Sequence, residues 1–395
     1  MPPRSKKTDT VLTHAGLAPE DNHGILNPPV YHASTVLFPT VAAMEAAQKN
    51  RNTKGTVSYG RHGTPTAFAL EEAVAAAENG ARGIAYCSGV AACHTAILAF
   101  VKAGDHLLMV DSVYDPVRSF CSHFLKRFGI ETTFYDPLIG GGITTLIRAN
   151  TRLIYMESPG SLTFEIQDVP AIVAVAQAHS ITTVLDNTWA SPLFFRPLDH
   201  GVDVSVISGT KYIGGHSDAM IGFAVCTEKS FPAVRQTTRE LGYHAAPDDC
   251  YLALRGLRSA AVRLRHHERQ ALALADWLGK RPEVERVLHP ALPGHPGHDI
   301  WQRDFTGSSG LFGIALRPDF TRKATAALLD GMELFGMGYS WGGFESLILP
   351  VHLEQHRSAR PWTGGPLIRI HAGLEDVDDL IADLERGFQR LNAAR

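Results

Sequence analysis

The chain has 395 residues, 45% of them hydrophobic, and carries a formal net charge of −3 with a pI near 6.7. It lacks the basic field that attracts nucleic acids and anionic membranes, and no apolar run reaches the roughly 18 residues of a membrane span. The length indicates two or three domains, and small molecules are the expected partners.

Several simple signals are absent from the sequence. The basic residues between Met1 and Thr10 are followed by no hydrophobic stretch, so no secretion signal is expected. The five cysteines have no CxxC spacing, which is typical of reduced thiols in a cytoplasmic protein. The nineteen histidines include the adjacent pair His266 and His267 but no HExxH motif, so no metal ion is expected.

Residues 1–60 are rich in turn formers, such as Asn27-Pro28-Pro29, and show little periodicity. Such a segment predicts an extended arm that needs a surface to lie against, either the body of its own chain or another subunit. We therefore treat residues 1–60 as an N-terminal arm.

Short apolar runs alternate with helical patterns from residue 61 to about residue 226. This alternation predicts βαβ units and a large, mostly parallel, seven-stranded sheet covered on both faces, as in α/β proteins. The last two runs are joined by a Gly-rich turn too short for a crossover helix, so they should be antiparallel. The expected strands are 83–87, 106–110, 131–135, 153–156, 182–185, 204–207 and 221–226, with helices at 89–101 and 169–178.

A second α/β pattern follows a long helical stretch at residues 260–278. It predicts a smaller C-terminal α/β domain over residues 257–395, packed closely on a first domain over residues 61–256. Its expected strands are 284–288, 311–316, 346–349 and 367–370, with helices near 321–330 and 375–390.

The segment Ser208-Gly209-Thr210-Lys211 ends one of the predicted strands. A lysine in an apolar setting has a lowered pKa and becomes the nucleophilic amine that an aldehyde cofactor requires. Ser208 and Thr210 add hydroxyl groups that could hold a phosphate. Taken alone, a lysine at a strand end is more often a solvated charge.

Asp186 ends a neighbouring predicted strand. The carboxyl ends of strands in open α/β sheets form the edge where ligands bind. A carboxylate there can keep a pyridine nitrogen protonated and so make the ring an electron acceptor. An aspartate in this position is also commonly a helix cap or a turn residue.

Three further features follow this pattern. The segment Tyr86-Cys87-Ser88-Gly89-Val90 runs from a strand into a helix, whose first backbone N–H groups can bind an anion. Tyr114 could stack on a planar ring, and Arg369 offers two parallel hydrogen bonds to a substrate carboxylate. Each feature alone has an ordinary structural explanation, but together they describe one site.

The segment 203–222, DVSVISGTKYIGGHSDAMIG, resembles the lysine signature of the Cys/Met-metabolism PLP-dependent enzymes of fold type I. The agreement extends over about residues 13–388, and the bacterial β-lyases of the family are the most similar branch. The other matching motifs are SYGR at 58–61, ESPGS at 157–161, DNTW at 186–189, SWGG at 340–343 and LIR at 367–369.

The resemblance implies a carbon–sulfur lyase that uses pyridoxal 5′-phosphate and cleaves L-cystathionine to homocysteine, pyruvate and ammonia in methionine biosynthesis. It implies that Lys211 forms the Schiff base and moves the Cα proton, that Asp186 pairs with the pyridine nitrogen, and that Tyr114 lies over the ring. Residues 61–256 would then be the cofactor-binding domain. γ-Lyase or γ-synthase chemistry of the same family is the alternative.

The resemblance also implies which residues hold the phosphate and the substrate, and that the assembly is a cytoplasmic homotetramer built as a dimer of dimers. The phosphate residues are Ser88, Gly89, Val90, Ser208 and Thr210, completed by Tyr59 and Arg61 from a neighbouring subunit. The substrate residues are Tyr59, Ser340, Trp341 and Arg369.

Three positions bear on which member of the family the chain resembles. Val90 stands where many relatives have methionine, which keeps a backbone N–H contact but alters packing around the ring. Trp341 stands where γ-acting relatives have a smaller residue, and Ser161 where they commonly have asparagine. The last two positions favour β-elimination, unless Trp341 only packs in the core.

Two other classes of function need consideration. Gly338-Tyr339-Ser340-Trp341-Gly342 matches the G-x-S-x-G nucleophile elbow of serine hydrolases, which requires a helix directly after the serine. The sequence after Ser340 predicts a turn and a strand instead. A protein of the same fold that has lost catalysis is disfavoured because Lys211, Asp186 and Arg369 are all present.

Overall fold

The structure, a computed structural model, describes residues 6–53, 55–353 and 357–395. Small parts of the predicted arm and C-terminal domain, residues 1–5, 54 and 354–356, lie outside the described residues.

The larger sheet has seven strands in the order β1-β7-β6-β5-β4-β2-β3. Strand β7 is antiparallel to β1 and β6, whereas the other neighbours are parallel, so the predicted mostly parallel sheet and its antiparallel pair are confirmed. The strands are β1 (Arg82–Tyr86), β2 (His106–Val110), β3 (Glu131–Tyr135), β4 (Thr151–Glu157), β5 (Thr182–Asp186), β6 (Val204–Ile207) and β7 (Gly222–Cys226).

Helices cover this sheet. Every residue of β2, β6 and β7 is buried, as expected for strands packed on both faces. Helix α3 (Pro65–Ala77) packs on β1, α4 (Gly89–Leu98) on β6 and β7, and α6 (Val169–Ala178) on β5. Helix α3 was not predicted, because this alanine-rich helix buries seven of its thirteen residues and shows little contrast between its faces. The other helices of this region are α5 (Asp115–Ser119), α7 (Ser191–Phe194) and α8 (Phe231–Leu241).

A smaller antiparallel sheet forms a second α/β unit, as predicted. Its strand order is β10-β11-β9-β8, and a second hydrophobic core lies between it, α11, α12 and the end of α9. The elements are β8 (Val284–Leu288), α10 (His298–Asp304), β9 (Leu311–Leu316), α11 (Arg322–Leu329), β10 (Leu347–Val351), β11 (Leu367–His371) and α12 (Val377–Ala393).

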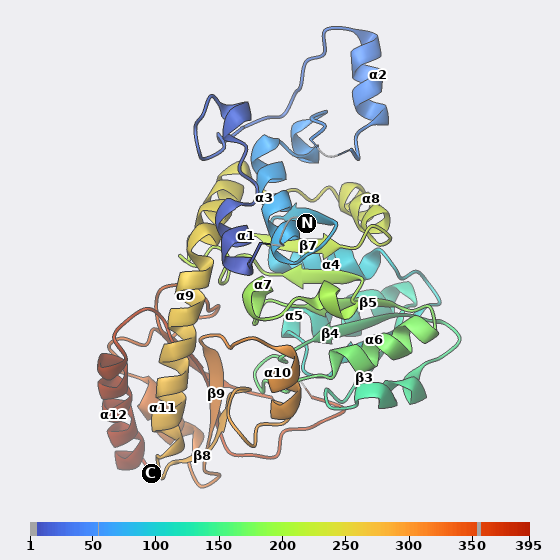
Figure 1. Cartoon of the computed structure of the whole chain (residues 1–395). Coiled ribbons are helices and arrows are strands. Elements are labelled where there is room, and N and C mark those ends of the chain that lie inside the picture. The colour runs from blue at the N-terminus through green and yellow to red at the C-terminus, as the bar shows by residue number, and fades with distance from the viewer. Residues whose placement is uncertain (1–5, 54, 354–356) are drawn as a thin grey trace.

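Helix α9 (Pro247–Gly279) runs along both units (Figure 1). It begins well before the predicted start at residue 260, and the predicted domain boundary at residues 256–257 therefore falls inside one continuous helix. Leu254 and Leu257 belong to the core of the larger sheet, whereas Leu274 and Leu278 belong to that of the smaller one.

The N-terminal arm has two parts. Helix α1 (Thr8–His14) packs on α9, where Arg258 Nη1 donates to the carbonyl oxygens of Leu12 and Ala15. Helix α2 (Val41–Lys49) buries none of its residues and stands away from the body at the top of Figure 1. The chain thus covers one part of the arm and leaves the other exposed.

Candidate active site

The carboxyl ends of β1, β5 and β6 bring the predicted chemistry to one edge of the larger sheet. Asp186 is the last residue of β5 and stands opposite Val206 of β6, and Lys211 follows β6 after a short turn. Because β1 is parallel to β6 across the intervening β7, the start of α4 reaches the same edge.

Lys211 is largely buried beside the loop that precedes β10. Its Nζ donates a hydrogen bond to Ser340 Oγ at 2.6 Å and lies 5.3 Å from the centre of the Trp341 ring. Burial and the Arg369 cation lower the pKa of Lys211 to about 8, although the Asp186 carboxylate opposes this shift. The lysine is therefore more readily a neutral, nucleophilic amine than a solvated lysine is.

Asp186 is buried and is held on one side only. Its Oδ1 accepts hydrogen bonds from the backbone N–H of Thr188 at 2.9 Å and from the Thr188 hydroxyl at 2.5 Å. Thr188 Oγ1 in turn accepts from the backbone N–H of Ser208, which ties Asp186 to the lysine turn. Within the described residues, the other oxygen, Oδ2, has one hydrogen-bond partner, the Cys93 thiol at 3.7 Å. A buried carboxylate oxygen with so weak a partner suits a protonated ring nitrogen.

The start of α4 forms an anion-binding cradle. Ser88 caps this helix, since its Oγ accepts from the backbone N–H of Ala91, and Gly89 and Val90 begin its first turn. Gly89 lies against Ser208: a Cβ at Gly89 would come within 2.7 Å of Ser208 Oγ. The helix N-terminus and a serine hydroxyl thus converge in the manner expected for a phosphate site.

The hydroxyl of Thr210, predicted to hold a phosphate, already makes hydrogen bonds within the protein. Its Oγ1 donates to the carbonyl oxygen of Ile221 and accepts from the backbone N–H of the same residue. The side chain therefore fixes the turn against β7, and its role toward a phosphate stays a prediction.

Arg369 and Ser340 come from the smaller sheet. Arg369 lies in the middle of β11, and its Nη2 donates to the carbonyl oxygen of Ser340 at 2.7 Å. Burial lowers the pKa of Arg369 to about 10, and no carboxylate of the described residues forms an ion pair with it. Arg369 is thus a cation without an anionic partner among the described residues, which suits a substrate carboxylate.

The loop that carries Ser340 has an unusual backbone. Ser340 has a φ of +79°, and Gly342, with a φ of +85°, packs directly on the backbone of Lys211.

Tyr114 lies at the same edge and is exposed, and a residue not predicted from the sequence, Glu157, positions its backbone. The backbone N–H of Tyr114 donates to Glu157 Oε2 at 2.7 Å, and Ser161 Oγ donates to Oε1 at 2.5 Å. Glu157 ends β4 and stands opposite Asp186 in the parallel register. Burial and the neighbouring Asp186 raise the pKa of Glu157. The rule that strand ends share an edge, applied to β4, would have found this residue.

Arg263 of α9 is a second residue of the site that was not predicted from the sequence. It is buried, and its Nη1 donates to the carbonyl oxygen of Tyr212 at 2.8 Å while Nη2 donates to Ile213 and Gly256. The guanidinium thereby holds the backbone directly after Lys211. No sequence signal distinguishes this arginine from the other arginines of α9.

Tyr59 and Arg61 are not brought to this edge within the chain. Tyr59 is at the end of the arm and Arg61 lies in the short 3-10 turn Gly60–His62 that follows it, where Arg61 Nη1 donates to the carbonyl oxygen of Arg239. In the described part of the chain, neither side chain hydrogen-bonds to Lys211, Asp186 or Arg369. Their predicted role in a neighbouring subunit stays a prediction.

The hydrolase alternative lacks its structural context. After Ser340 the described chain forms bends that lead into β10 instead of a helix, and the hydroxyl of Ser340 is bonded to Lys211. Among the described residues, no group of three or more side chains could bind a metal ion. Within the same residues, no helix combines the length and apolarity needed to cross a membrane.

A partly buried lysine, a carboxylate with one open oxygen and a helix N-terminus at the carboxyl edge of a seven-stranded α/β sheet define a class, the fold type I enzymes that use pyridoxal phosphate. The chain belongs to the Cys/Met metabolism PLP-dependent enzymes, whose family model matches residues 9–389.

Named proteins resemble nearly the whole chain. It is 45% identical to cystathionine beta-lyase MetC of Escherichia coli, over 98% of this chain and 99% of that protein. It is also 45% identical to the cystathionine beta-lyase of Salmonella typhimurium, with the same coverage. Among solved structures, the crystal structure of metB from Corynebacterium glutamicum matches with a TM-score of 0.89 and 31% identity, over 99% of this chain and 100% of that chain.

Proposed function

We propose that this protein is a cystathionine β-lyase, which converts L-cystathionine and water to homocysteine, pyruvate and ammonia. The observation that carries the proposal is the convergence of Lys211, Asp186 and Arg369 in a chain that resembles two named cystathionine beta-lyases over 98% of its length. Trp341, whose ring lies beside the amine of Lys211, supports β- over γ-cleavage.

The cofactor's phosphate would be held by the start of α4, through the N–H groups of Gly89 and Val90 and the hydroxyl of Ser88, together with Ser208 and Thr210. When bound, pyridoxal phosphate supplies an aldehyde that links to amines and a ring that takes up an electron pair from the substrate. Asp186 Oδ2 would hold a proton on the ring nitrogen, and Tyr114 would lie over the ring.

Arg369 would bind the substrate and Lys211 would transfer its proton. Arg369 would bind the substrate α-carboxylate, because it is a partly buried cation at the same edge with no anionic partner among the described residues. Lys211 Nζ would take the proton from the substrate Cα, since its lowered pKa leaves a substantial fraction neutral near pH 8. Ser340 Oγ would orient that amine and contact the carboxylate.

We also propose that the functional unit is a cytoplasmic homotetramer, a dimer of dimers, in which Tyr59 and Arg61 reach the phosphate site of a neighbour. Large apolar side chains of the arm are solvent-exposed in the single chain, which favours burial against another subunit. They are Ile25, Leu26, Tyr31, Leu37, Val41, Met44 and Tyr59. All five cysteines are free thiols, which suits a reducing compartment.

The test is to identify the keto acid that the purified protein forms from L-cystathionine. Pyruvate in equimolar amount with homocysteine is the expected result, and Lys211→Ala should abolish its formation. Mainly 2-oxobutyrate would indicate γ-cleavage and overturn the β-lyase proposal, while leaving the cofactor site intact.

A further inference from the structure

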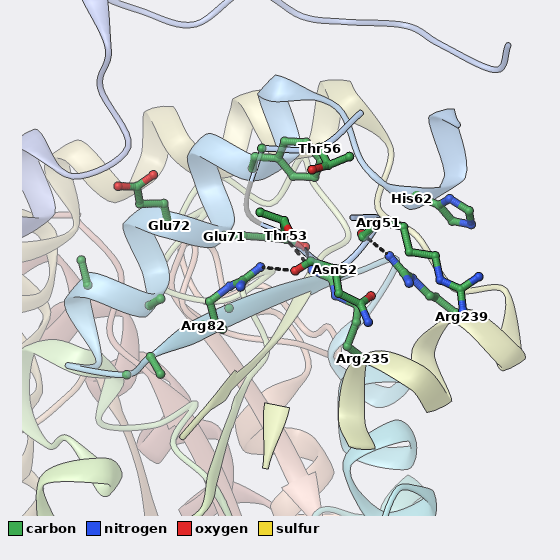
Figure 2. Close-up of a pocket in the computed structure, with 17 residues that line it drawn as sticks. Arg51, Asn52, Thr53, Thr56, His62, Glu71, Glu72, Arg82, Arg235 and Arg239 are labelled. Carbon is green, nitrogen blue, oxygen red and sulfur yellow. Dashed lines mark hydrogen bonds and ion pairs between the residues drawn. The ribbon is translucent and has the colours of Figure 1, made fainter. Parts of the chain in front are cut away.

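A second pocket lies at the amino end of β1, away from the candidate active site at the carboxyl end of that strand. It has a volume of about 190 Å³ and is lined by residues 51–53, 55 and 56 of the arm, by α3 and by α8. Figure 2 shows the side chains of Arg51, Arg82, Arg235 and Arg239 gathered around it. Nothing in the proposed mechanism uses these residues.

The lining of the pocket carries an excess of positive charge, although the whole chain is net negative. Four arginines face two glutamates, Glu71 and Glu72, which leaves two uncompensated positive charges. Glu71 is already bound: it pairs with Arg235 at 3.1 Å and accepts from the backbone N–H of Ala85.

Arg239, which lines the pocket, has hydrogen-bond donors without an acceptor. Its Nη2 donates to the carbonyl oxygen of Arg51, but its Nε and Nη1 are buried without a hydrogen-bond partner in the described structure. Burial and then Arg235, Arg51 and Arg61 lower the pKa of Arg239 to about 10. Burial followed by the same arginines and Arg239 also lowers the pKa of the neighbouring His62. Buried donors and crowded cations both favour a bound anion.

We propose that this pocket binds a phosphate group, either free inorganic phosphate or the phosphate of a small ester. A phosphate dianion supplies several acceptor oxygens and two charges, so it can satisfy the open N–H groups of Arg239 and engage Arg51 or Arg82 at once. A single carboxylate would leave one of the two excess charges in place. A bound phosphate would link the arm segment to α8 and β1. This arm segment lies only a few residues before Arg61.

The experiment uses the cofactor-loaded enzyme in a phosphate-free buffer, so that the cofactor phosphate already fills its own site. Isothermal titration calorimetry with inorganic phosphate and with methyl phosphate separates the two sources, and sodium chloride at matched ionic strength controls for screening. We expect saturable binding of at least one phosphate compound, with chloride giving no saturable signal. Binding of phosphate but not of methyl phosphate would identify the free ion as the ligand.

Arg239→Gln and Arg82→Gln each remove one charge from the pocket, and each should weaken phosphate binding at least tenfold. Arg127→Gln removes the same charge from an exposed position elsewhere and should leave binding unchanged. Two pocket variants are used so that one misfolded protein does not decide the result. The proposal is overturned if wild-type enzyme shows no saturable phosphate binding, or if both pocket variants bind as tightly as wild type.

Discussion

Lys211 Nζ lies 2.6 Å from Ser340 Oγ, so a serine on the loop before β10 of the smaller sheet holds the amine that follows β6 of the larger one. The two residues are 129 positions apart in the chain. The reactivity of Lys211 therefore depends on how the two α/β units pack, and Ser340 is the most direct place to test this.

Replacing Ser340 with glycine should reduce kcat/KM for cystathionine by about tenfold without lowering the melting temperature. The variant loses one hydrogen bond to the lysine, worth about 1.5–3 kcal/mol for a charged donor, while glycine accepts the φ of +79° without strain. Ser340→Ala loses the same hydroxyl and serves as a second, independent test of its role. Full activity in both variants would contradict a positioning role for the hydroxyl.

The amine of Lys211 should destabilise the cofactor-free protein at neutral pH. Its pKa in the folded state is about 8, against an ordinary value of 10.5, so the unfolded chain binds more protons between these values and stability rises with pH through that window. Lys211→Met should therefore gain up to roughly 3 kcal/mol in urea unfolding at pH 7, and the gain should shrink toward pH 10.5. Lys102→Met, at an exposed position, should show no such trend.

Glu157→Gln should preserve cofactor absorbance and most activity at pH 7. Burial beside Asp186 raises the pKa of Glu157, so the folded state binds more protons than the unfolded state above the ordinary value of 4.5. Wild-type stability then falls as pH rises from 5 to 8, whereas the neutral glutamine carries no such penalty. Melting temperatures of both proteins at pH 5 and pH 8 test this. A difference that does not grow with pH would show that Glu157 is ionised in the folded protein.

Trp341→Leu should reduce kcat/KM for cystathionine by roughly 10- to 200-fold, the effect of losing one substrate contact. The indole is only partly buried and lies beside the Lys211 amine, so its loss should lower thermal stability little. Trp362→Leu removes another partly buried indole, which packs beside Arg286, and serves as the matched control. If both variants lose stability and activity in parallel, Trp341 acts by packing alone.

Arg61→Ala and Lys211→Ala should each be inactive alone and should regain partial activity when the chains are mixed and reassembled. Some sites of the hybrid would contain Arg61 from one subunit and Lys211 from the other. Activity is measured on hybrids whose mixed composition is verified by mass spectrometry. No recovery in such hybrids would count against a shared site.

Local patterns in the sequence determined much of this protein. Apolar runs predicted all seven strands of the larger sheet, and the short Gly-rich turn before β7 predicted its antiparallel pairing with β6, because these features depend on residues close together in the chain. The rule that parallel strands end at one edge predicted that Asp186 and Lys211 meet. The family motifs then suggested a role for each residue.

Contacts between distant segments were decided only by the tertiary structure. Arg263 holds the backbone after Lys211, and Arg239 has two buried nitrogens without a hydrogen-bond partner beside a pocket lined in part by the arm, yet nothing in the surrounding sequence distinguishes either arginine. Such features arise from side chains that meet across 50 residues or more, and local periodicity carries no information about which ones will meet.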